Sequence, residues 1–450
     1  MDVVDHKPNG LLRHLVEEGG LSEAQLAAEI RRVAAEHGQQ LACHQSSVSR
    51  WLSGVRPRPP VDVFLLEALA RRLGRPLTPA EAGLSKTVPD DIPRGGRSWE
   101  AAPVHTLFAL LRADLDPARR RLLAADVYSL TSLALPAPAG PHASSPAAAH
   151  RAPTPAPLPA RAQQMDTMAR HFADAAEAFG GGAVRTALAG YLAHPVNGWL
   201  NAPAPEPVHR HLLAAAARLT LLLGTMTADD GHDALAQHYH HTAARMATDA
   251  DDATALAITL RTMAAHASDL GHHTPAVLHL SQHAVDTARG APPPVRAYTH
   301  AQLATAAAHH NRRAALLALN RAEQLYEKAD TVLGPFTAYP LAALHYQRAQ
   351  TLNILGDTRG SIGAYTASLR LRTPTERHAR ALTQARLGET LLAQGHLDAA
   401  LTHWTHFLDA YPHLSSLRAT RHLHTMRQLL TPHQRHRPTG HLLDSALTLR

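Results

Sequence analysis

Cysteine is almost absent from this sequence: Cys43 is the only one among 450 residues. A single thiol cannot form a disulfide within the chain, which suits the reducing environment of the cytoplasm. Cys43 lies just before a short polar helix predicted for residues 45–53, so two roles stay open for it, a redox switch or a small buried hydrophobic residue. The second role is the commoner one for a free cysteine, and we expect it here.

Aromatic side chains are also scarce, at 4% of the residues, and only three of the 44 basic residues are lysines. With so few rings, hydrophobic cores must be built from alanine and leucine, and such a composition with few β-branched runs favours helices. We therefore expect an all-α protein with two or three domains. The bias towards arginine, alanine and histidine is typical of a GC-rich coding sequence, so it does not by itself indicate nucleic-acid binding.

Signals for export or membrane insertion are missing too. The N-terminus carries no apolar segment flanked by basic residues. The stretch from Ala124 to Leu135 follows three arginines, as in an export signal, but it is internal, interrupted by Asp126 and too short to span a bilayer. We expect a cytoplasmic protein without membrane contact.

Motifs of catalysis and of metal binding are also missing. The glycines at 180–182 precede a predicted helix, but no Gly-Lys-Ser/Thr follows them, so a tight helix–helix turn is the ordinary interpretation. With 34 histidines, pairs at helical spacing arise by chance, and no zinc-protease motif or cysteine partner accompanies them. These pairs are His238/His241, His279/His283 and His403/His406. We expect no enzymatic activity and no bound metal or cofactor.

The most informative segment runs from Gln45 to Gly54. Val48, Trp51 and Leu52 fall at i, i+3 and i+4, so they share a face of a helix that can be buried. The remaining residues can hydrogen-bond to base edges or phosphates: Gln45, Ser46, Ser47, Ser49 and Arg50. Gly54 supplies a left-handed stop. A short polar helix of this kind fits the major groove of DNA.

The flanking sequence predicts a compact helical domain over residues 1–86. Ser22 and Gln25 fit a capping box at the start of a second helix, and Thr78 and Glu81 fit another one further along. Together with an early amphipathic helix and one that ends at Gly74, about five short helices are expected around one core. Charge is nearly balanced in this domain, with 11 basic and 10 acidic residues, so DNA contact depends on local arginines. Between Arg50 and Arg75 these are Arg50, Arg56, Arg58, Arg71, Arg72 and Arg75.

From Leu21 to Leu84 the sequence resembles the phage-repressor-type helix-turn-helix of the xenobiotic-response-element regulators. The resemblance is carried by Ser22 with Gln25-Leu26-Ala27, by the segment 47–54, and by Arg56-Pro57-Arg58-Pro59-Pro60. A longer helix and the loop 39–44 replace the usual tight turn. The resemblance implies that base edges and phosphates are contacted by Gln45, Ser46, Ser47, Ser49 and Arg50, with Arg56 and Arg58 mainly on the backbone. It also implies a homodimer on a double-stranded operator.

The rest of the chain divides by composition. Residues 87–135 are expected to be a helical connector, 136–160 a Pro/Ala-rich flexible linker, 161–430 a helical repeat domain and 431–450 a C-terminal tail. In the repeat domain, turn markers recur at intervals of about 40 residues. They are Leu270-Gly271, His310-Asn311, Leu355-Gly356 and Gln394-Gly395. Small residues are expected at the helix crossings, namely Ala349, Ala364, Ala385, Ala399 and Ala400.

This region resembles degenerate tetratricopeptide repeats, which stack into an α-solenoid with a concave face. The order of domains is similar to that of peptide-sensing regulators. The favoured hypothesis is a sequence-specific DNA-binding transcriptional regulator whose repeat domain dimerises, senses a peptide or small-molecule effector, or both. In that case Asn311 and Asn353 could hold a peptide backbone, although helix capping is the commoner role. The alternative is a repeat-based protein–protein interaction adaptor without DNA binding.

Overall fold

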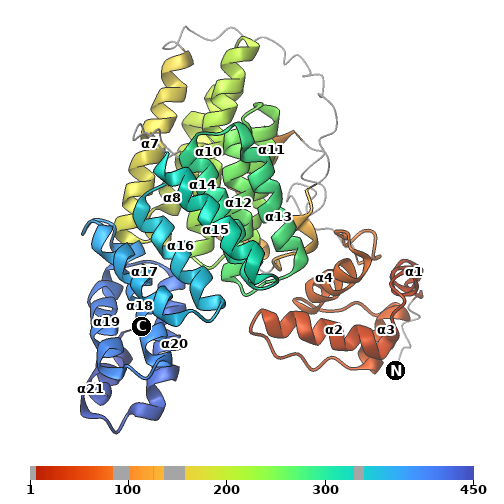
Figure 1. Ribbon diagram of the computed structural model, residues 1–450. Helices are drawn as coiled ribbons and strands as arrows, with labels where there is room; N and C mark the ends of the chain where they lie inside the picture. The colour runs from red at the N-terminus through yellow and green to blue at the C-terminus, as the bar shows by residue number, and fades with distance from the viewer. Residues whose placement is uncertain (1–6, 85–101, 125, 136–157, 329–338, 450) are drawn as a thin grey trace. The chain divides into compact units, whose positions relative to one another are not determined.

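The computed structural model describes all residues except 1–6, 85–101, 125, 136–157, 329–338 and 450. Every regular element in the described residues is helical, as expected from the alanine- and leucine-rich composition (Figure 1). The chain divides into two compact units. The first comprises Met1–Ala139 with Asp233–Thr242, and the second comprises Gly140–His232 with Ala243–Arg450.

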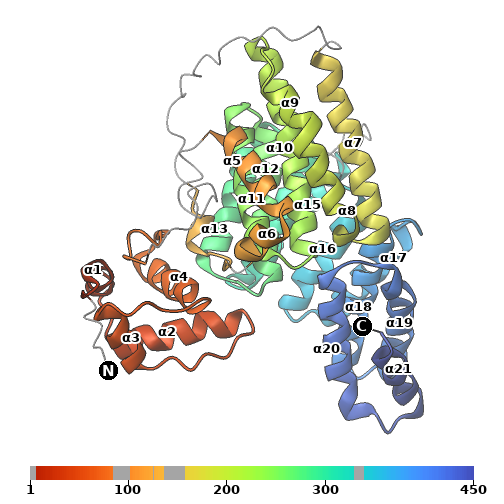
Figure 2. The ribbon, with the colours of Figure 1, turned by 180° about the vertical axis from the view of Figure 1, so that it is seen from behind.

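The first unit begins with a cluster of four helices (Figure 2). They are α1 (Gly10–Glu18), α2 (Glu23–Glu36), α3 (Gln45–Leu52) and α4 (Val61–Leu73). Their apolar faces form one core, in which Leu12, Leu26, Ile30, Leu65 and Leu69 are fully buried. The capping box predicted at the start of α2 is present: Ser22 Oγ accepts from the Gln25 N–H, and Gln25 Oε1 accepts from the Ser22 N–H at 2.8 Å.

The expected fifth helix of this cluster does not form, and residues 78–84 make a single turn instead. Its start is as predicted, because Glu81 accepts from the backbone and hydroxyl of Thr78 at 2.7 Å. The helix ends at once because Gly83 adopts a φ of +63° and Leu84 N–H donates to the Pro79 carbonyl at 2.8 Å, which is the closing bond of a Schellman motif. The start and stop signals are too close together for a helix.

The connector region belongs to the same unit. It contains α5 (Pro103–Leu115), α6 (Pro117–Ala124) and the 3₁₀ turn η1 (Thr131–Leu133), and it packs with the first part of α11 (Asp233–Asp249). Gln237 of α11 exchanges two hydrogen bonds with the Ser129 backbone, at 2.8 and 2.7 Å. The Leu130 N–H donates to Glu67 of α4 at 3.0 Å. The Leu130 bond attaches the connector to the four-helix cluster, and the Gln237 bonds attach it to α11.

The second unit consists of helical hairpins preceded by a group of helices that includes the two longest ones described, α7 and α10 (Figure 1). The first group is α7 (Leu158–Phe179), α8 (Gly181–Tyr191), the π-helical turn η2 (Leu192–Val196), α9 (Asn197–Leu200) and α10 (Glu206–Asp229). The hairpin helices are α12 (Ala253–Asp269), α13 (Pro275–Thr287), α14 (Pro293–Ala308), α15 (Arg312–Glu327), α16 (Leu341–Ile354), α17 (Thr358–Leu371), α18 (Arg377–Ala393) and α19 (Leu397–Ala410). Shorter 3₁₀ turns are η3 (Ala288–Gly290), η4 (Tyr411–His413) and η5 (Thr431–His433), and the chain ends with α20 (Leu417–Leu430) and α21 (Arg437–Leu447).

The four turn markers predicted from the sequence each lie between the two helices of a hairpin. The hairpins are α12/α13, α14/α15, α16/α17 and α18/α19, and successive first helices α12, α14 and α16 pack on one another, as in a solenoid. Four of the five expected crossing residues are buried, whereas Ala399 is exposed. The segment 431–450, expected to be a tail, contains α21, which packs on α19 and α20 with Ala446 fully buried. The predicted linker 136–160 lies outside the described residues except for 158–160, which begin α7.

The glycine run 180–182 is a junction between distant parts of the second unit. The Ser415 N–H donates to the Phe179 carbonyl at 2.7 Å, and the Gly182 N–H donates back to the Ser415 carbonyl at 3.0 Å. The Gly181 N–H donates to Asp229 at 2.8 Å, and the Ser416 hydroxyl donates to the same carboxylate at 2.6 Å. The expected tight helix–helix turn is therefore present, and it also joins α7 and α8 to the loop before α20.

One helix, α10, is long and apolar enough by length and composition to cross a membrane. However, 72% of its most apolar window is buried within the protein. This packing is that of a core helix, because a helix that spans a bilayer turns its apolar surface to lipid.

Candidate nucleic-acid interface

One face of α3 is anchored in the core of the four-helix cluster. Val48 is fully buried, and Trp51 and Leu52 are 8% and 4% exposed. These are the three residues that the i, i+3, i+4 spacing assigns to the buried face. The helix therefore has a fixed rotation about its axis, and its other residues must face away from this core.

The opposite face of α3 is polar and open. Gln45, Ser46, Ser49 and Arg50 are exposed, and Ser47 is half-buried. Ser47 Oγ accepts only a long hydrogen bond, at 3.5 Å, from the His44 N–H. Most of the predicted contact residues thus lie together on one accessible surface with their hydrogen-bonding groups available to a ligand.

Hydrogen bonds to backbone carbonyls hold both ends of α3. At its C-terminus Gly54 has a φ of +103°, and the Gly54 and Val55 N–H groups donate to the Trp51 and Arg50 carbonyls at 3.1 and 3.0 Å. This pair of bonds is a Schellman motif, so the predicted glycine stop is present. The loop before α3 is held by Arg31, which donates to the Cys43 carbonyl.

Asn9 also supports the interface, although the sequence reasoning does not single it out. Its N–H donates to the Leu52 carbonyl at 3.0 Å, and its side chain accepts from the Leu12 N–H at 3.0 Å and donates to the Ala82 carbonyl at 2.9 Å. Asn9 therefore joins α1, the end of α3 and the turn 78–84. An asparagine directly before an amphipathic helix is an N-cap signal that could have identified one of these three contacts.

Arg50, Arg56 and Arg58 are exposed, and none of them makes an ion pair with another described residue. An exposed guanidinium without an ionic partner among these residues can bind a phosphate. Because these three arginines lie on α3 and on the loop that follows it, their positive charge is placed beside the polar face of the helix.

The other three arginines of the predicted patch have partners within the domain. Arg71 pairs with Glu67 and Glu36 at 2.8 and 2.6 Å. Arg72 donates to the Gly19 carbonyl at 2.6 Å, and Arg75 pairs with Glu81 at 2.9 Å. The six-arginine patch inferred from the sequence thus shrinks to three available groups, because linear spacing does not reveal which arginines meet acidic or carbonyl partners in the fold.

Cys43 is buried, with 3% of its surface exposed. Burial raises the pKa of its thiol, and the nearby charge of Arg31 offsets this only in part. A buried thiol of raised pKa is a poor nucleophile, so its environment favours a packing role over redox chemistry.

The histidine pairs do not extend into larger ligand sets. Within the described parts of the chain, no group of three or more histidine, cysteine, aspartate or glutamate side chains converges on a point where a metal could sit. Burial lowers the pKa of His241 to about 3, with a further contribution from His238. The imidazole of His241 is therefore neutral.

A sequence comparison with protein families matches residues 12–85 to the family described as the SP15 N-terminal domain. The match begins within α1 and ends one residue after the turn that follows α4, so it coincides with the four-helix cluster that carries α3. No curated protein matches the chain.

Proposed function

We propose that this protein is a cytoplasmic, sequence-specific DNA-binding transcriptional regulator of the helix-turn-helix type. The observation that carries the proposal is the two-sided character of α3: Val48, Trp51 and Leu52 are buried, while Gln45, Ser46, Ser49 and Arg50 are exposed. An anchored helix with an open polar face is what the major groove admits. The resemblance to xenobiotic-response-element regulators supports the same conclusion.

In this proposal, the polar face of α3 reads base edges and the loop after the helix contacts the DNA backbone. Gln45, Ser46, Ser47 and Ser49 donate and accept hydrogen bonds, and Arg50 binds a guanine edge or a phosphate. Arg56 and Arg58 bind phosphates. A single small module gives limited affinity, so we propose a homodimer on two half-sites that are one or two helical turns apart.

The second unit supplies the regulatory part of the proposed function. Its hairpins resemble tetratricopeptide repeats, which offer extended surfaces for a second copy of the chain or for a peptide or small-molecule effector. Asn311 is committed to the start of α15, where its side chain accepts from the Ala314 N–H at 3.0 Å. This bond favours the capping role for Asn311 over a role in holding a peptide. We propose no catalytic activity for either unit.

A gel-shift experiment tests the proposal. Genomic fragments are incubated at two salt concentrations with the wild type, with Arg50→Ala and with Arg32→Ala. Arg32 is the matched control, since it is an exposed arginine of the same domain whose charge is already paired with Glu29. Specific retardation by the wild type and Arg32→Ala is expected, and Arg50→Ala should bind roughly 10- to 100-fold more weakly, because a base contact contributes about 1–3 kcal/mol.

Two outcomes would contradict the proposal. If the wild type retards no fragment even at low salt, the protein is not a DNA-binding regulator, and the adaptor hypothesis gains if a protein partner co-purifies. If all three proteins retard every fragment alike and lose binding together at the higher salt, the binding is non-specific and α3 reads no sequence.

A further inference from the structure

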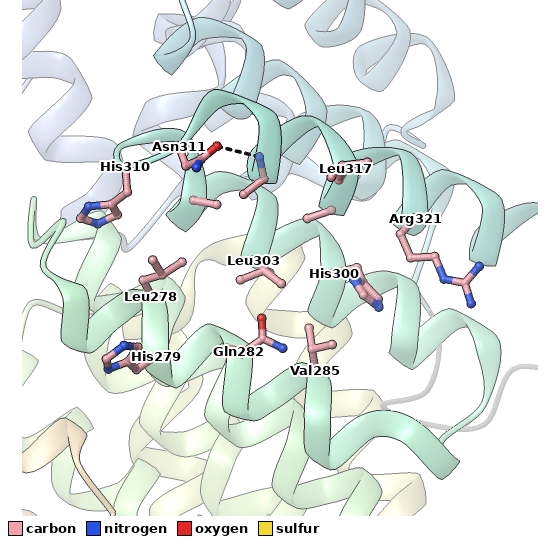
Figure 3. Close-up of a pocket in the computed structure, with 13 residues that line it drawn as sticks. Leu278, His279, Gln282, Val285, His300, Leu303, His310, Asn311, Leu317 and Arg321 are labelled. Carbon is pink, nitrogen blue, oxygen red and sulfur yellow. Dashed lines mark hydrogen bonds between the residues drawn. The ribbon is translucent and has the colours of Figure 1, made fainter.

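A groove lies between α13 and α15, with α14 as its floor (Figure 3). Its volume is about 550 Å³, which lies within the range of small-molecule sites. Apolar side chains line much of the groove, with Leu278 and Val285 on one wall, Leu303 on the floor and Leu317 on the other wall, while the neutral Gln282 lies between Leu278 and Val285. Leu317 is 62% exposed, although it is a large apolar residue on an ordered helix. Its side chain is therefore accessible to a ligand in the groove.

The polar groups of the groove are basic or neutral. None of its thirteen described lining residues is acidic. Figure 3 shows Arg321 and His300 towards one end, with His279 and His310 at the other. Within the described part of the chain, Arg321 makes no ion pair and donates only to Gln324 on its own helix, at 3.4 Å. Its guanidinium is therefore available to an anion.

His300 provides a second polar group at the same end. Its Nδ1 is buried and has no hydrogen-bond partner among the described residues. Burial lowers the pKa of His300 to about 4, with smaller contributions from Arg321 and Arg296. The ring is therefore neutral at pH 7 and can bond to a polar group without adding charge.

We infer that this groove binds a small amphipathic carboxylate, whose apolar chain lies over Leu278, Leu303 and Leu317 and whose carboxylate meets Arg321. Charge complementarity selects this class over an uncharged or cationic ligand, because the described lining contains no acid and Arg321 makes no ion pair with a described residue. The apolar walls select it over a small hydrophilic anion. The binding itself does not depend on DNA; only its use as an effector signal rests on the proposed function.

The test is a calorimetric titration of the full-length protein with sodium dodecanoate, kept below its micellar concentration at pH 7.5. Dodecanol, which has the same chain without the charge, is titrated in parallel. We expect one dodecanoate per chain and weaker binding of dodecanol. Arg321→Gln should weaken the binding of dodecanoate roughly tenfold and leave the binding of dodecanol unchanged, because the substitution removes only a charge-assisted bond. Leu317→Gln should weaken the binding of both ligands.

Arg313→Gln is the matched control, since Arg313 is an exposed arginine of the same helix that does not line the groove. It should bind dodecanoate as the wild type does. All three substituted residues are exposed, so the variants are expected to fold. Absence of saturable binding would overturn the inference, as would binding that survives both Arg321→Gln and Leu317→Gln. A dimer that Leu317→Gln dissociates, without dodecanoate binding, would identify the groove as a contact between copies and would also overturn it.

The two proposals can fail separately. Dodecanoate binding without any specific gel shift would leave the groove as a ligand site on a protein that does not bind DNA. A specific gel shift without dodecanoate binding would leave the DNA proposal intact and remove this one.

Discussion

Gly180 permits two distant segments of the second unit to touch. Its backbone has a φ of +84° and a ψ of 157°, a conformation that is almost restricted to glycine. A Cβ atom at this position would lie 2.5 Å from the Ser415 carbonyl oxygen. Both the backbone conformation and the close approach therefore require a residue without a side chain.

Replacement of Gly180 by alanine is expected to lower the free energy of unfolding of the second unit by about 2–3 kcal/mol, because it combines backbone strain with a steric clash. Gly190→Ala is the control. Gly190 lies within α8 with nothing near its missing Cβ, so alanine there should be neutral or stabilise by about 0.5–1 kcal/mol. Urea unfolding followed by circular dichroism measures both. If the two variants change the free energy of unfolding equally, the structural requirement for glycine at position 180 is contradicted.

Asp229 makes the same junction sensitive to acid. Burial raises the pKa of its carboxyl, but His378 at 3.2 Å, the charge of Arg418 and the Ser416 hydroxyl outweigh burial and leave the pKa below its ordinary value. A carboxyl with a depressed pKa in the folded state stabilises the fold above its unfolded pKa of about 4 and loses that contribution as the pH falls through the folded value.

Asp229→Asn should therefore destabilise the second unit by about 2 kcal/mol at pH 7, because it weakens a buried set of charge-assisted bonds. The difference in unfolding free energy between the wild type and Asp229→Asn should become smaller as the pH is lowered from 5 to about 3. Urea unfolding at each pH measures this difference. Asp286→Asn removes a surface pair with Arg289, and its effect should stay within about 0.5 kcal/mol. If the difference in unfolding free energy for Asp229→Asn does not change with pH, the stabilising role of the ionised Asp229 carboxylate is contradicted.

At the scale of single elements, local signals in the sequence were sufficient for much of the fold. The capping box at Ser22, the stop at Gly54 and the buried face Val48, Trp51 and Leu52 all depend on residues within one or two turns of each other, and all were predicted correctly. The prediction of a fifth helix was wrong because the start signal at Thr78 is followed too soon by the stop at Gly83.

The same local chemistry separates a residue that stabilises from one that is available for binding. Ser22→Ala should cost about 1 kcal/mol of unfolding free energy, since it removes the N-cap of α2, whereas Ser22→Asp should be close to neutral. Ser46 is exposed on α3 and makes no hydrogen bond to another described side chain, so Ser46→Ala should leave stability within about 0.5 kcal/mol. If the proposed function holds, Ser46→Ala should weaken DNA binding. Thermal unfolding and the gel shift measure the two effects separately; a stability loss at Ser46 would contradict this division.

At the scale of the whole molecule, contacts between distant segments were beyond sequence reasoning. Ser416 and Asp229 are 187 positions apart, and Tyr239 reaches Asp114 across 125 positions at 2.8 Å. Neither residue pair has a local pattern that identifies its partner. For the same reason, the sequence could not show that Arg71, Arg72 and Arg75 have partners within the first unit, whereas Arg50, Arg56 and Arg58 make no ion pair with any described residue.

If the proposed function holds, this difference among the arginines makes a quantitative prediction about the proposed homodimer on DNA. Removal of one phosphate contact should reduce the slope of log affinity against log salt by about 0.9, so a homodimer without Arg58 in either copy should have a slope smaller by nearly 2 units. The affinity of Arg58→Ala should fall by a similar factor on every DNA sequence, because a phosphate contact carries no sequence information. Titrations of operator and non-operator DNA at several salt concentrations measure both quantities. Arg32→Ala should keep the wild-type slope, since Arg32 is already paired with Glu29. If Arg58→Ala keeps that slope as well, Arg58 does not contact a phosphate, and this part of the proposed interface is wrong.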